Sequence, residues 1–241
     1  TVPGVSGFQL RFSSDPVYTP GDLCDVLVAM NAAALKVNLR GLKYGAKIIA
    51  NKDGFDAKNL RLAKYPDGVN PLEDGSLDGY EVIEMDVTRM TREALKDFTT
   101  LGTKEKDRAK NMFVLGFLYW MYNRDLDNTI RFIQQKFKNK PDILESNLAV
   151  LKAGYFYGDT TETFTSRYKV EKAKLPPGKY RSIMGNQALV YGLIAASQKS
   201  GLPIFLGTYP ITPASDILHE LSKNKSFGIR TFQAEDEIAG I

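Results

Sequence analysis

Residues 202–241 read LPIFLGTYPITPASDILHELSKNKSFGIRTFQAEDEIAGI, and the architecture of the chain is best inferred from them. Residues 202–206 are a short apolar run after the breaker Gly201, which predicts a buried strand. Residues 229–233 predict a second strand, and a helix is expected from Ala234 onward. The stretch therefore predicts two strands that alternate with helices, as in an α/β sheet.

The segment between these strands predicts a helix and a ligand-binding edge. Thr212 followed by Pro213 is typical of a helix start, with Thr212 as the N-cap and Pro213 in the first helical position. One face of this helix is apolar, formed by Ile217, Leu218 and Leu221. Polar residues follow the carboxyl ends of both strands, where open α/β sheets bind ligands.

The amino-acid sequences of the two strand–loop junctions are more specific than their pattern of apolar and polar residues. YPITP (residues 209–213) and QAEDE (residues 233–237) together closely resemble the pyrimidine-binding domain of 2-oxoacid:ferredoxin oxidoreductases. The resemblance is to the α subunit that carries a fused γ domain ahead of the pyrimidine domain. It implies a thiamine-diphosphate enzyme that converts a 2-oxoacid and coenzyme A into an acyl-CoA, CO2 and reduced ferredoxin. The fused arrangement favours 2-oxoglutarate, or a broad range of 2-oxoacids, over pyruvate.

The resemblance implies catalytic roles for Glu235 and Thr212. Glu235 matches the carboxylate that hydrogen-bonds N1′ of the cofactor's aminopyrimidine, while Asp236 and Glu237 compete for that role but are expected on other faces of the helix. The alternative for Glu235 is that it only complements a helix N-terminus. Thr212 matches the residue that hydrogen-bonds the 2-oxo group, and its alternative is plain N-capping.

The remaining site residues belong to the same loop. Tyr209 and Pro210 shape it, and with Thr212 they form the expected substrate-binding set. The sequence has no Gly-Asp-Gly motif followed by Asn for the Mg²⁺–diphosphate group. The resemblance places that motif, and the ligands of the 4Fe–4S cluster, in a partner β subunit. We therefore expect no metal site in this chain and no productive binding of thiamine diphosphate by the chain alone.

Composition excludes several classes of protein. The 241 residues carry a formal net charge of +4 with mixed signs, which does not indicate a nucleic-acid binder. Cys24 is the single cysteine, so an intrachain disulfide and a cysteine-ligated iron–sulfur cluster are excluded. The longest apolar run, residues 112–122, is far below the ~20 residues needed to span a bilayer. The single cysteine fits a cytoplasmic location. Residues 1–9 (TVPGVSGFQ) do not have the pattern of a secretory signal.

The first 158 residues read as a second α/β unit. The pattern predicts strands at residues 7–13, 25–30, 47–50 and 80–86. It predicts helices at residues 33–44, 90–98, 109–122, 127–138 and 141–155. The strand–helix–strand order favours a parallel pair, and residues 51–79 read as a long surface excursion. The last three helices resemble the helical end of the fused γ domain.

The predicted domain organisation follows from these elements. Residues 1–158 are expected to form a γ-type α/β domain with a C-terminal helical layer, without its usual glycine-rich N-terminal segment. Residues 159–183 have little periodicity and predict an inter-domain linker. Residues 184–241 are expected to be the start of the pyrimidine-binding α/β domain, opened by a helix over residues 185–200. Both ends of the chain look cut, so we expect an internal fragment.

Other residues that could carry chemistry have simpler interpretations. His219 has no second histidine or cysteine beside it, so it is expected to be a solvated helix residue. Cys24 and Trp120 are expected to pack. Gly185 is not part of a dinucleotide-binding fingerprint. The lysines of the predicted linker are expected to be solvated; they are Lys169, Lys172 and Lys174.

Two other functions stay open at the level of the sequence. One is a non-catalytic module, in which the α/β unit and the helices serve subunit assembly. The other is the pyrimidine domain of a different thiamine-dependent enzyme, of the transketolase type. YPITP argues against the second.

Overall fold

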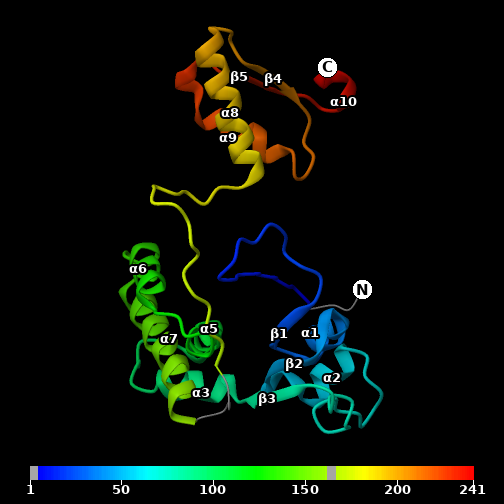
Figure 1. Cartoon of the computed structure of the whole chain (residues 1–241). Coiled ribbons are helices and arrows are strands. Elements are labelled where there is room, and N and C mark those ends of the chain that lie inside the picture. The colour runs from blue at the N-terminus through cyan, green and yellow to red at the C-terminus, as the bar shows by residue number, and fades with distance from the viewer. Residues whose placement is uncertain (1–4, 162–166) are drawn as a thin grey trace. The chain divides into compact units, whose positions relative to one another are not determined.

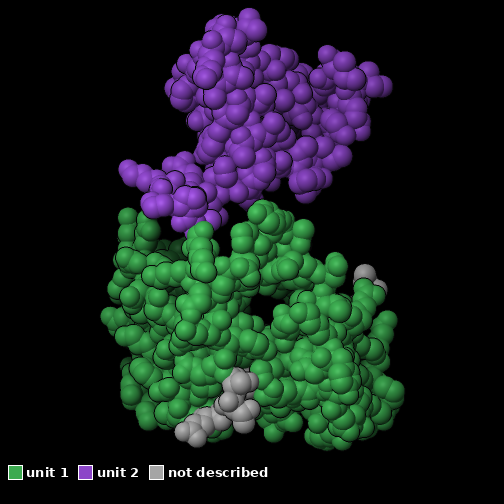
Figure 2. All heavy atoms as spheres, in the orientation of Figure 1, with its two compact units in different colours: residues 1–174 green, residues 175–241 purple. Residues whose placement is uncertain are grey.

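The computed structural model describes residues 5–161 and 167–241 and divides the chain into two compact units. Unit 1 spans residues 1–174 and unit 2 spans residues 175–241 (Figure 2). Each unit has its own parallel sheet, so the prediction of a mixed α/β fold with parallel strands is confirmed. In the part of the chain that is described, no helix combines the length and the apolar character needed to cross a membrane.

Unit 1 is built on a three-stranded parallel sheet (Figure 1). Its strands are β1 (Cys24–Ala29), β2 (Leu42–Asn51) and β3 (Glu81–Met85), in the order β1-β2-β3. The central strand β2 is covered on both faces, and consecutive residues Ile48, Ile49 and Ala50 are all buried. The strands predicted at residues 25–30, 47–50 and 80–86 are therefore confirmed, although β2 begins at Leu42, before the predicted residue 47.

Two predictions near the start of unit 1 are wrong. Residues 7–13 form no strand, because no neighbouring strand in the described part of the chain supplies backbone partners for them. The helix predicted over residues 33–44 is shorter: α1 spans Ala32–Asn38, a 3₁₀ turn follows at Leu39–Gly41, and β2 already begins at Leu42. Pairing with β1 draws this segment into the sheet, which outweighs its local helical pattern.

Residues 51–79 form only partly the surface loop that was predicted. They contain a 3₁₀ turn (Lys52–Phe55) and the short helix α2 (Ala57–Leu62). The side chains of Phe55, Ala63 and Leu77 are buried in the core with α1 and β2. This connection therefore covers one side of the sheet of unit 1.

Five helices follow β3. They are α3 (Val87–Ala94), α4 (Thr103–Arg108), α5 (Lys110–Met121), α6 (Asp127–Lys136) and α7 (Pro141–Thr161). The three long predicted helices are confirmed, with α7 extending six residues beyond residue 155. Helix α3 begins earlier than predicted because the Asp86 side chain caps it by accepting a hydrogen bond from the Arg89 backbone N–H (3.2 Å). Helix α4 was not predicted.

Helices α5 and α7 pack backbone to backbone through glycines. A Cβ atom at Gly116 would collide with the carbonyl oxygen of Leu151, and a Cβ atom at Gly154 would collide with the carbonyl oxygen of Phe113. Around this contact Phe117, Val150 and other residues form a buried core that continues to β3. The close approach fixes α7 against the helix that follows the sheet.

The predicted linker, residues 159–183, begins inside α7 and contains residues 162–166, which lie outside the described residues. Residues 167–184 form no helix or strand. The backbone N–H of Tyr168 donates to the carbonyl of Met121 (2.9 Å), and that of Glu171 donates to the Ser14 hydroxyl (2.8 Å). The first described part of this segment is therefore fastened to unit 1.

Unit 2 contains α8 (Gly185–Ser200), β4 (Phe205–Thr208), α9 (Ser215–Lys223), β5 (Arg230–Gln233) and α10 (Glu237–Gly240). Helix α8 has the predicted bounds, and Gly201 ends it with a left-handed φ of 72°. Strands β4 and β5 are parallel (Figure 1). A small core of Val190, Ile194, Leu221 and Ile229 lies between the two helices and the sheet.

The first strand of unit 2 differs from its prediction in place and burial. It begins at Phe205 rather than residue 202, and Leu202 and Phe205 are both exposed. Leu206 packs against the core with α8 and α9, while the side chain of Phe205 lies on the opposite face of the strand. Among the described residues of unit 2, the helices cover one face of the sheet. Strand β4, which was predicted to be buried, is therefore covered on one side only.

Candidate functional site

The carboxyl ends of β4 and β5 form one edge of the sheet in unit 2. The strands are parallel, and their last residues, Thr208 and Gln233, are paired. The backbone N–H of Ala234 donates to the carbonyl of Thr208 at 2.6 Å. The loop after β4 and the acidic segment after β5 therefore start side by side, as the sequence predicted.

The loop after β4 corrects the role expected for Thr212. The peptide bond between Thr212 and Pro213 is cis, and α9 begins only at Ser215, with Ala214 as an N-cap that makes no side-chain bond. Thr212 is therefore not the helix cap, and Pro213 is not in the first helical position. Local cap chemistry suggested that role, but the chain completes a separate loop before the helix starts.

Hydrogen bonds hold the residues on both sides of Thr212, while Thr212 itself is exposed. The Ser215 hydroxyl accepts a hydrogen bond from the backbone N–H of Ile211 (3.1 Å) and donates to the carbonyl of the same residue (3.0 Å). On the other side of Thr212, the Asn186 side chain of α8 donates to the carbonyl of Pro213 (3.0 Å). Thr212 is exposed, and no hydrogen bond of its hydroxyl is described. The hydroxyl is thus available to a ligand at this edge.

The acidic segment after β5 also departs from the prediction. The helix expected from Ala234 starts at Glu237, and Asp236 is its N-cap, accepting a hydrogen bond from the Ala239 backbone N–H (2.9 Å). Glu235 lies before this cap, so its direction relative to Glu237 is not set by helical spacing. The alternative expected for Glu235, that it only complements the helix start, is not met, because Asp236 caps α10 and Glu235 lies before the cap. Glu235 is exposed, with no described side-chain partner.

Glu237 faces the loop after β4. The Glu237 carboxylate acts on the Tyr209 hydroxyl and raises the pKa of the Tyr209 phenol above its ordinary value. Tyr209 is partly buried, while Pro210 beside it is exposed. Sequence reasoning placed Tyr209 in the loop but missed its interaction with Glu237, because the two segments meet only through the parallel pairing of β4 and β5.

A glycine contact holds α10 close to β4. A Cβ atom built on Gly207 would lie 2.6 Å from the carbonyl oxygen of Gly240, well inside van der Waals contact. A side chain at position 207 would therefore push α10 away from the edge. The contact keeps the acidic segment near the loop that contains Thr212.

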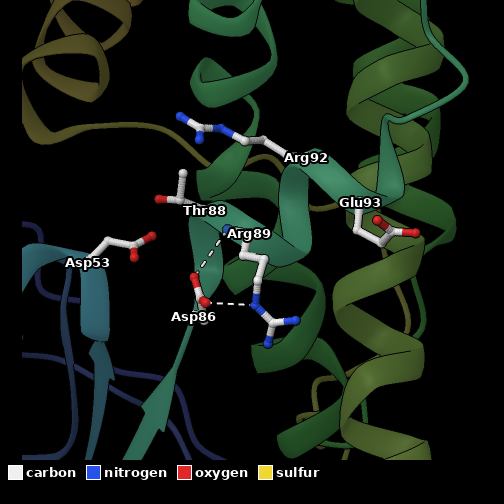
Figure 3. Close-up of a pocket in the computed structure, with 6 residues that line it drawn as sticks. All are labelled: Asp53, Asp86, Thr88, Arg89, Arg92 and Glu93. Carbon is white, nitrogen blue, oxygen red and sulfur yellow. Dashed lines mark hydrogen bonds and ion pairs between the residues drawn. The ribbon is translucent and has the colours of Figure 1, made fainter.

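Unit 1 has a hollow at the carboxyl ends of its strands (Figure 3). This cavity of about 510 Å³ lies between the turn after β2 and helix α3. Its lining residues are Asp53, Asp86, Thr88, Arg89, Arg92 and Glu93. A neighbouring hollow shares Asp53, Asp86 and Arg89 and adds Lys52.

Each cation around these hollows has an ionic partner. Arg89 pairs with Asp86 (2.7 Å), Arg92 pairs with Asp107 (2.7 Å) and Lys52 pairs with Glu84 (3.1 Å). Burial opposes ionisation of Asp86, but hydrogen bonds from the Arg89 side chain and backbone outweigh it and lower the pKa of this carboxyl group. Because carboxylates outnumber cations along the lining, we assign no anionic ligand to it.

The other residues singled out in the sequence have the simple roles expected. His219 is exposed on α9, Cys24 is partly buried at the start of β1, and Trp120 is buried in the core of unit 1. Lys169 is exposed and pairs with Glu171 (2.6 Å). Among the described residues, no group of three or more potential metal ligands is found.

Comparisons with known proteins agree with the resemblance found in the two junctions. Residues 3–157 match the family model described as Pyruvate ferredoxin/flavodoxin oxidoreductase. The whole chain is 52% identical to the 2-oxoglutarate oxidoreductase subunit KorA of Mycobacterium tuberculosis, over 243 aligned residues. The chain spans about a third of that relative, 36% of its length.

A solved structure shares the fold. It is a 2-oxoglutarate:ferredoxin oxidoreductase from Magnetococcus marinus with 2-oxoglutarate, coenzyme A and succinyl-CoA bound. The likeness covers 93% of this chain and 34% of the other, with a TM-score of 0.69 and 24% identity.

Proposed function

We propose, from the premise that this chain belongs to the pyruvate ferredoxin/flavodoxin oxidoreductase family, that the whole protein is a thiamine-diphosphate-dependent 2-oxoacid:ferredoxin oxidoreductase. The family predicted from YPITP is thereby confirmed. The proposed substrate is 2-oxoglutarate. The observation that carries this choice is 52% identity, over the full chain, to a relative named 2-oxoglutarate oxidoreductase subunit KorA.

The proposed reaction is an oxidative decarboxylation. The bond between the carboxyl group and the oxo carbon breaks and releases CO2, and the thiol of coenzyme A joins the remaining acyl group. Two electrons leave the substrate carbon and reduce ferredoxin, one electron for each of two ferredoxin molecules. The thiol of coenzyme A loses its proton, so the products are succinyl-CoA, CO2, reduced ferredoxin and one H+.

The edge of the sheet in unit 2 fits the part of the cofactor that this chain is expected to contact. When bound, thiamine diphosphate supplies the nucleophilic carbon that attacks the 2-oxo group. A carboxylate must hydrogen-bond the ring nitrogen N1′ of its aminopyrimidine. Glu235 is exposed at the edge and has no described side-chain partner, so its carboxylate is free to accept this bond. We propose Glu235 for the role, as the resemblance implies.

Glu237 is the competing carboxylate, and one contact supports it. Its carboxylate acts on the Tyr209 hydroxyl of the YPITP loop, whereas the Asp236 side chain is used to cap α10. The argument that helical spacing separates Glu237 from the site does not apply, because Glu235 lies outside the helix. Substitution of the two glutamates by glutamine separates these assignments.

Thr212 is proposed to contact the substrate. The 2-oxo oxygen gains negative charge during attack, and a hydroxyl group held near it stabilises that charge. The exposed hydroxyl of Thr212, flanked by two fastened residues, has the freedom to donate this hydrogen bond. Tyr209 and Pro210 shape the same loop and complete the proposed substrate-binding set.

The proposed assembly follows the family resemblance. Unit 1 corresponds to a γ-type domain, and unit 2 to the start of the pyrimidine-binding domain. A partner β subunit would bind Mg²⁺ with the cofactor's diphosphate and the 4Fe–4S cluster, and it would pass electrons to ferredoxin. The proposed location is the cytoplasm. We assign no coenzyme A contacts, since each cation lining the hollows of unit 1 is already paired.

The test is an activity assay on the whole protein with its partner subunit. Reduction of ferredoxin and formation of acyl-CoA should both require coenzyme A and a 2-oxoacid, and 2-oxoglutarate should give a higher kcat/KM than pyruvate. Activity with pyruvate alone would overturn the substrate assignment. A cofactor-loaded enzyme that reduces ferredoxin with none of a set of 2-oxoacids would overturn the function.

A further inference from the structure

We propose that Asn186, in the first turn of α8, is a positioning residue that holds the loop containing Thr212. This inference rests on the proposed function, since it concerns how the substrate-facing hydroxyl is placed. Asn186 lies 27 residues before Pro213 in the chain, and its side-chain Nδ2 donates to the Pro213 carbonyl at 3.0 Å. The contact therefore joins a separate helix to the loop at the residue directly after Thr212.

The amide of Asn186 is not needed to start its own helix. The N-cap of α8 is Met184, and no side chain caps this helix. In the described part of the chain, the hydrogen bond of the Asn186 side chain is the one to Pro213. Asn186 is also partly buried, although the residues just before it are exposed. The Asn186 side chain therefore bonds the loop and does not cap its own helix.

On the Pro213 side, the loop's own backbone bond is long: the Pro213 carbonyl accepts from the Asp216 backbone N–H at 3.3 Å. A carbonyl oxygen has two lone pairs, so it can also accept the bond from the Asn186 amide. On the other flank of Thr212, the Ser215 hydroxyl bonds both backbone groups of Ile211, and the Ser215 backbone N–H also donates to the Ile211 carbonyl (2.9 Å). Thr212 is therefore fixed between two anchors, with its own side chain exposed.

The expected consequence is kinetic. A misplacement of about 1 Å at a reacting group can lower turnover by as much as ~100-fold. Loss of the Asn186 anchor should therefore weaken the contact between Thr212 and the 2-oxo group while leaving the acidic segment after β5 in place. The effect should depend on the presence of the Thr212 hydroxyl, since Asn186 itself does not contact the substrate.

The test is a double-mutant cycle in the whole enzyme with its partner subunit. Asn186→Asp keeps the shape of the side chain but removes the donor, and it should lower kcat/KM for 2-oxoglutarate about ten- to a hundredfold. In a Thr212→Val background the same substitution should change kcat/KM by less than about twofold, because coupled residues are not additive. Binding of thiamine diphosphate should stay within about twofold of wild type in all four proteins.

Two further variants guard against a general loss of folding. Gln187→Ala is the matched control: this neighbouring amide on α8 bonds Glu220 at 3.4 Å, away from the loop, and the variant should keep wild-type kinetics. Asn186→Gln keeps an amide donor and should retain more activity than Asn186→Asp. If Asn186→Asp does not assemble, Ser215→Ala, which removes the two hydroxyl bonds to Ile211 on the other flank, should show the same dependence on Thr212.

The outcomes separate this inference from the proposed function. A wild-type enzyme without 2-oxoacid-dependent reduction of ferredoxin would overturn the function. An active wild-type enzyme in which the losses from Asn186→Asp and Thr212→Val multiply independently would overturn the positioning role alone. Unchanged kinetics of Asn186→Asp would do the same.

Discussion

The Glu237 carboxylate, on the first residue of α10, acts on the Tyr209 hydroxyl in the loop after β4 and raises the pKa of this phenol above its ordinary value. The two segments at the edge of the sheet in unit 2 are therefore related through these side chains as well as through the pairing of β4 with β5.

Replacing Tyr209 tests this link. Tyr209→Phe keeps the ring and removes the hydroxyl, so the Glu237 side chain and α10 should become more mobile. Backbone amides of α10 should exchange with solvent faster than in wild type, while those of α8 should be unchanged. Equal exchange in both proteins would show that this interaction does not hold α10.

Thr212→Val should affect catalysis rather than stability. The substitution removes the hydroxyl proposed to stabilise the developing oxyanion, a loss of ~3 kcal/mol in the transition state or about a hundredfold in kcat/KM. Because Thr212 is not the cap of α9, the melting temperature of the whole protein should not change. A lower melting temperature with unchanged kinetics would contradict the proposed role.

The glycine contact between α5 and α7 predicts a loss of stability. Gly154→Ala places a methyl group against the carbonyl oxygen of Phe113, and such overpacking typically costs about 1–3 kcal/mol. The matched control is Gly192→Ala in the middle of α8, where an added Cβ meets nothing within 4 Å. Alanine is the better helix former by about 1 kcal/mol, so the control should raise the melting temperature. If both variants have the same melting temperature, α5 and α7 can move apart without a loss of stability.

The pair of Arg92 and Asp107 predicts a pH-dependent contribution to stability. The hydrogen bonds from Arg92, at 2.7 and 2.8 Å, lower the pKa of the Asp107 carboxyl group. A lowered pKa stabilises the folded state above the ordinary value of about 4, and this stabilisation is lost as the pH falls through the folded-state pKa. Asp107→Asn should therefore lower the melting temperature at pH 7, and the difference should shrink below about pH 4.

The control for this pair is Glu145→Gln. Glu145 is exposed on α7, and no ion pair is described for it. Its substitution should give a smaller change in melting temperature at pH 7. A difference for Asp107→Asn that stays constant down to acid pH would show that ionisation of Asp107 is not the cause.

Local sequence signals predicted the elements that depend on local interactions or that place apolar side chains in the core. Helix α8 has the predicted bounds because Val190 and Ile194, four residues apart, are buried and Gly201 can adopt the left-handed conformation that ends a helix. The strands of unit 1 were found because each contains apolar residues that enter the core, as Ala29, Ile49 and Ile83 do. For these elements the pattern of side chains and the tertiary environment require the same backbone.

The predictions that failed depended on partners distant in the sequence. Residues 7–13 alternate like a strand, but alternation does not supply a neighbouring strand. Thr212 and Pro213 have the chemistry of a helix start, yet Ser215 and the distant Asn186 hold them in a loop. The interaction of Tyr209 with Glu237 depends on the pairing of β4 with β5, and spacing along the chain does not show it.

The most direct test of the proposed site is exchange of the C2 proton of thiamine diphosphate in the whole enzyme with its partner subunit. Glu235→Gln is isosteric and should still bind the cofactor, but it should stop this exchange because the amide cannot share a proton with N1′ as the carboxylate does. Glu237→Gln should exchange at nearly the wild-type rate. If Glu237→Gln stops exchange instead, the role passes to the carboxylate that acts on Tyr209; if neither variant slows it, the edge formed by β4 and β5 is not the cofactor site.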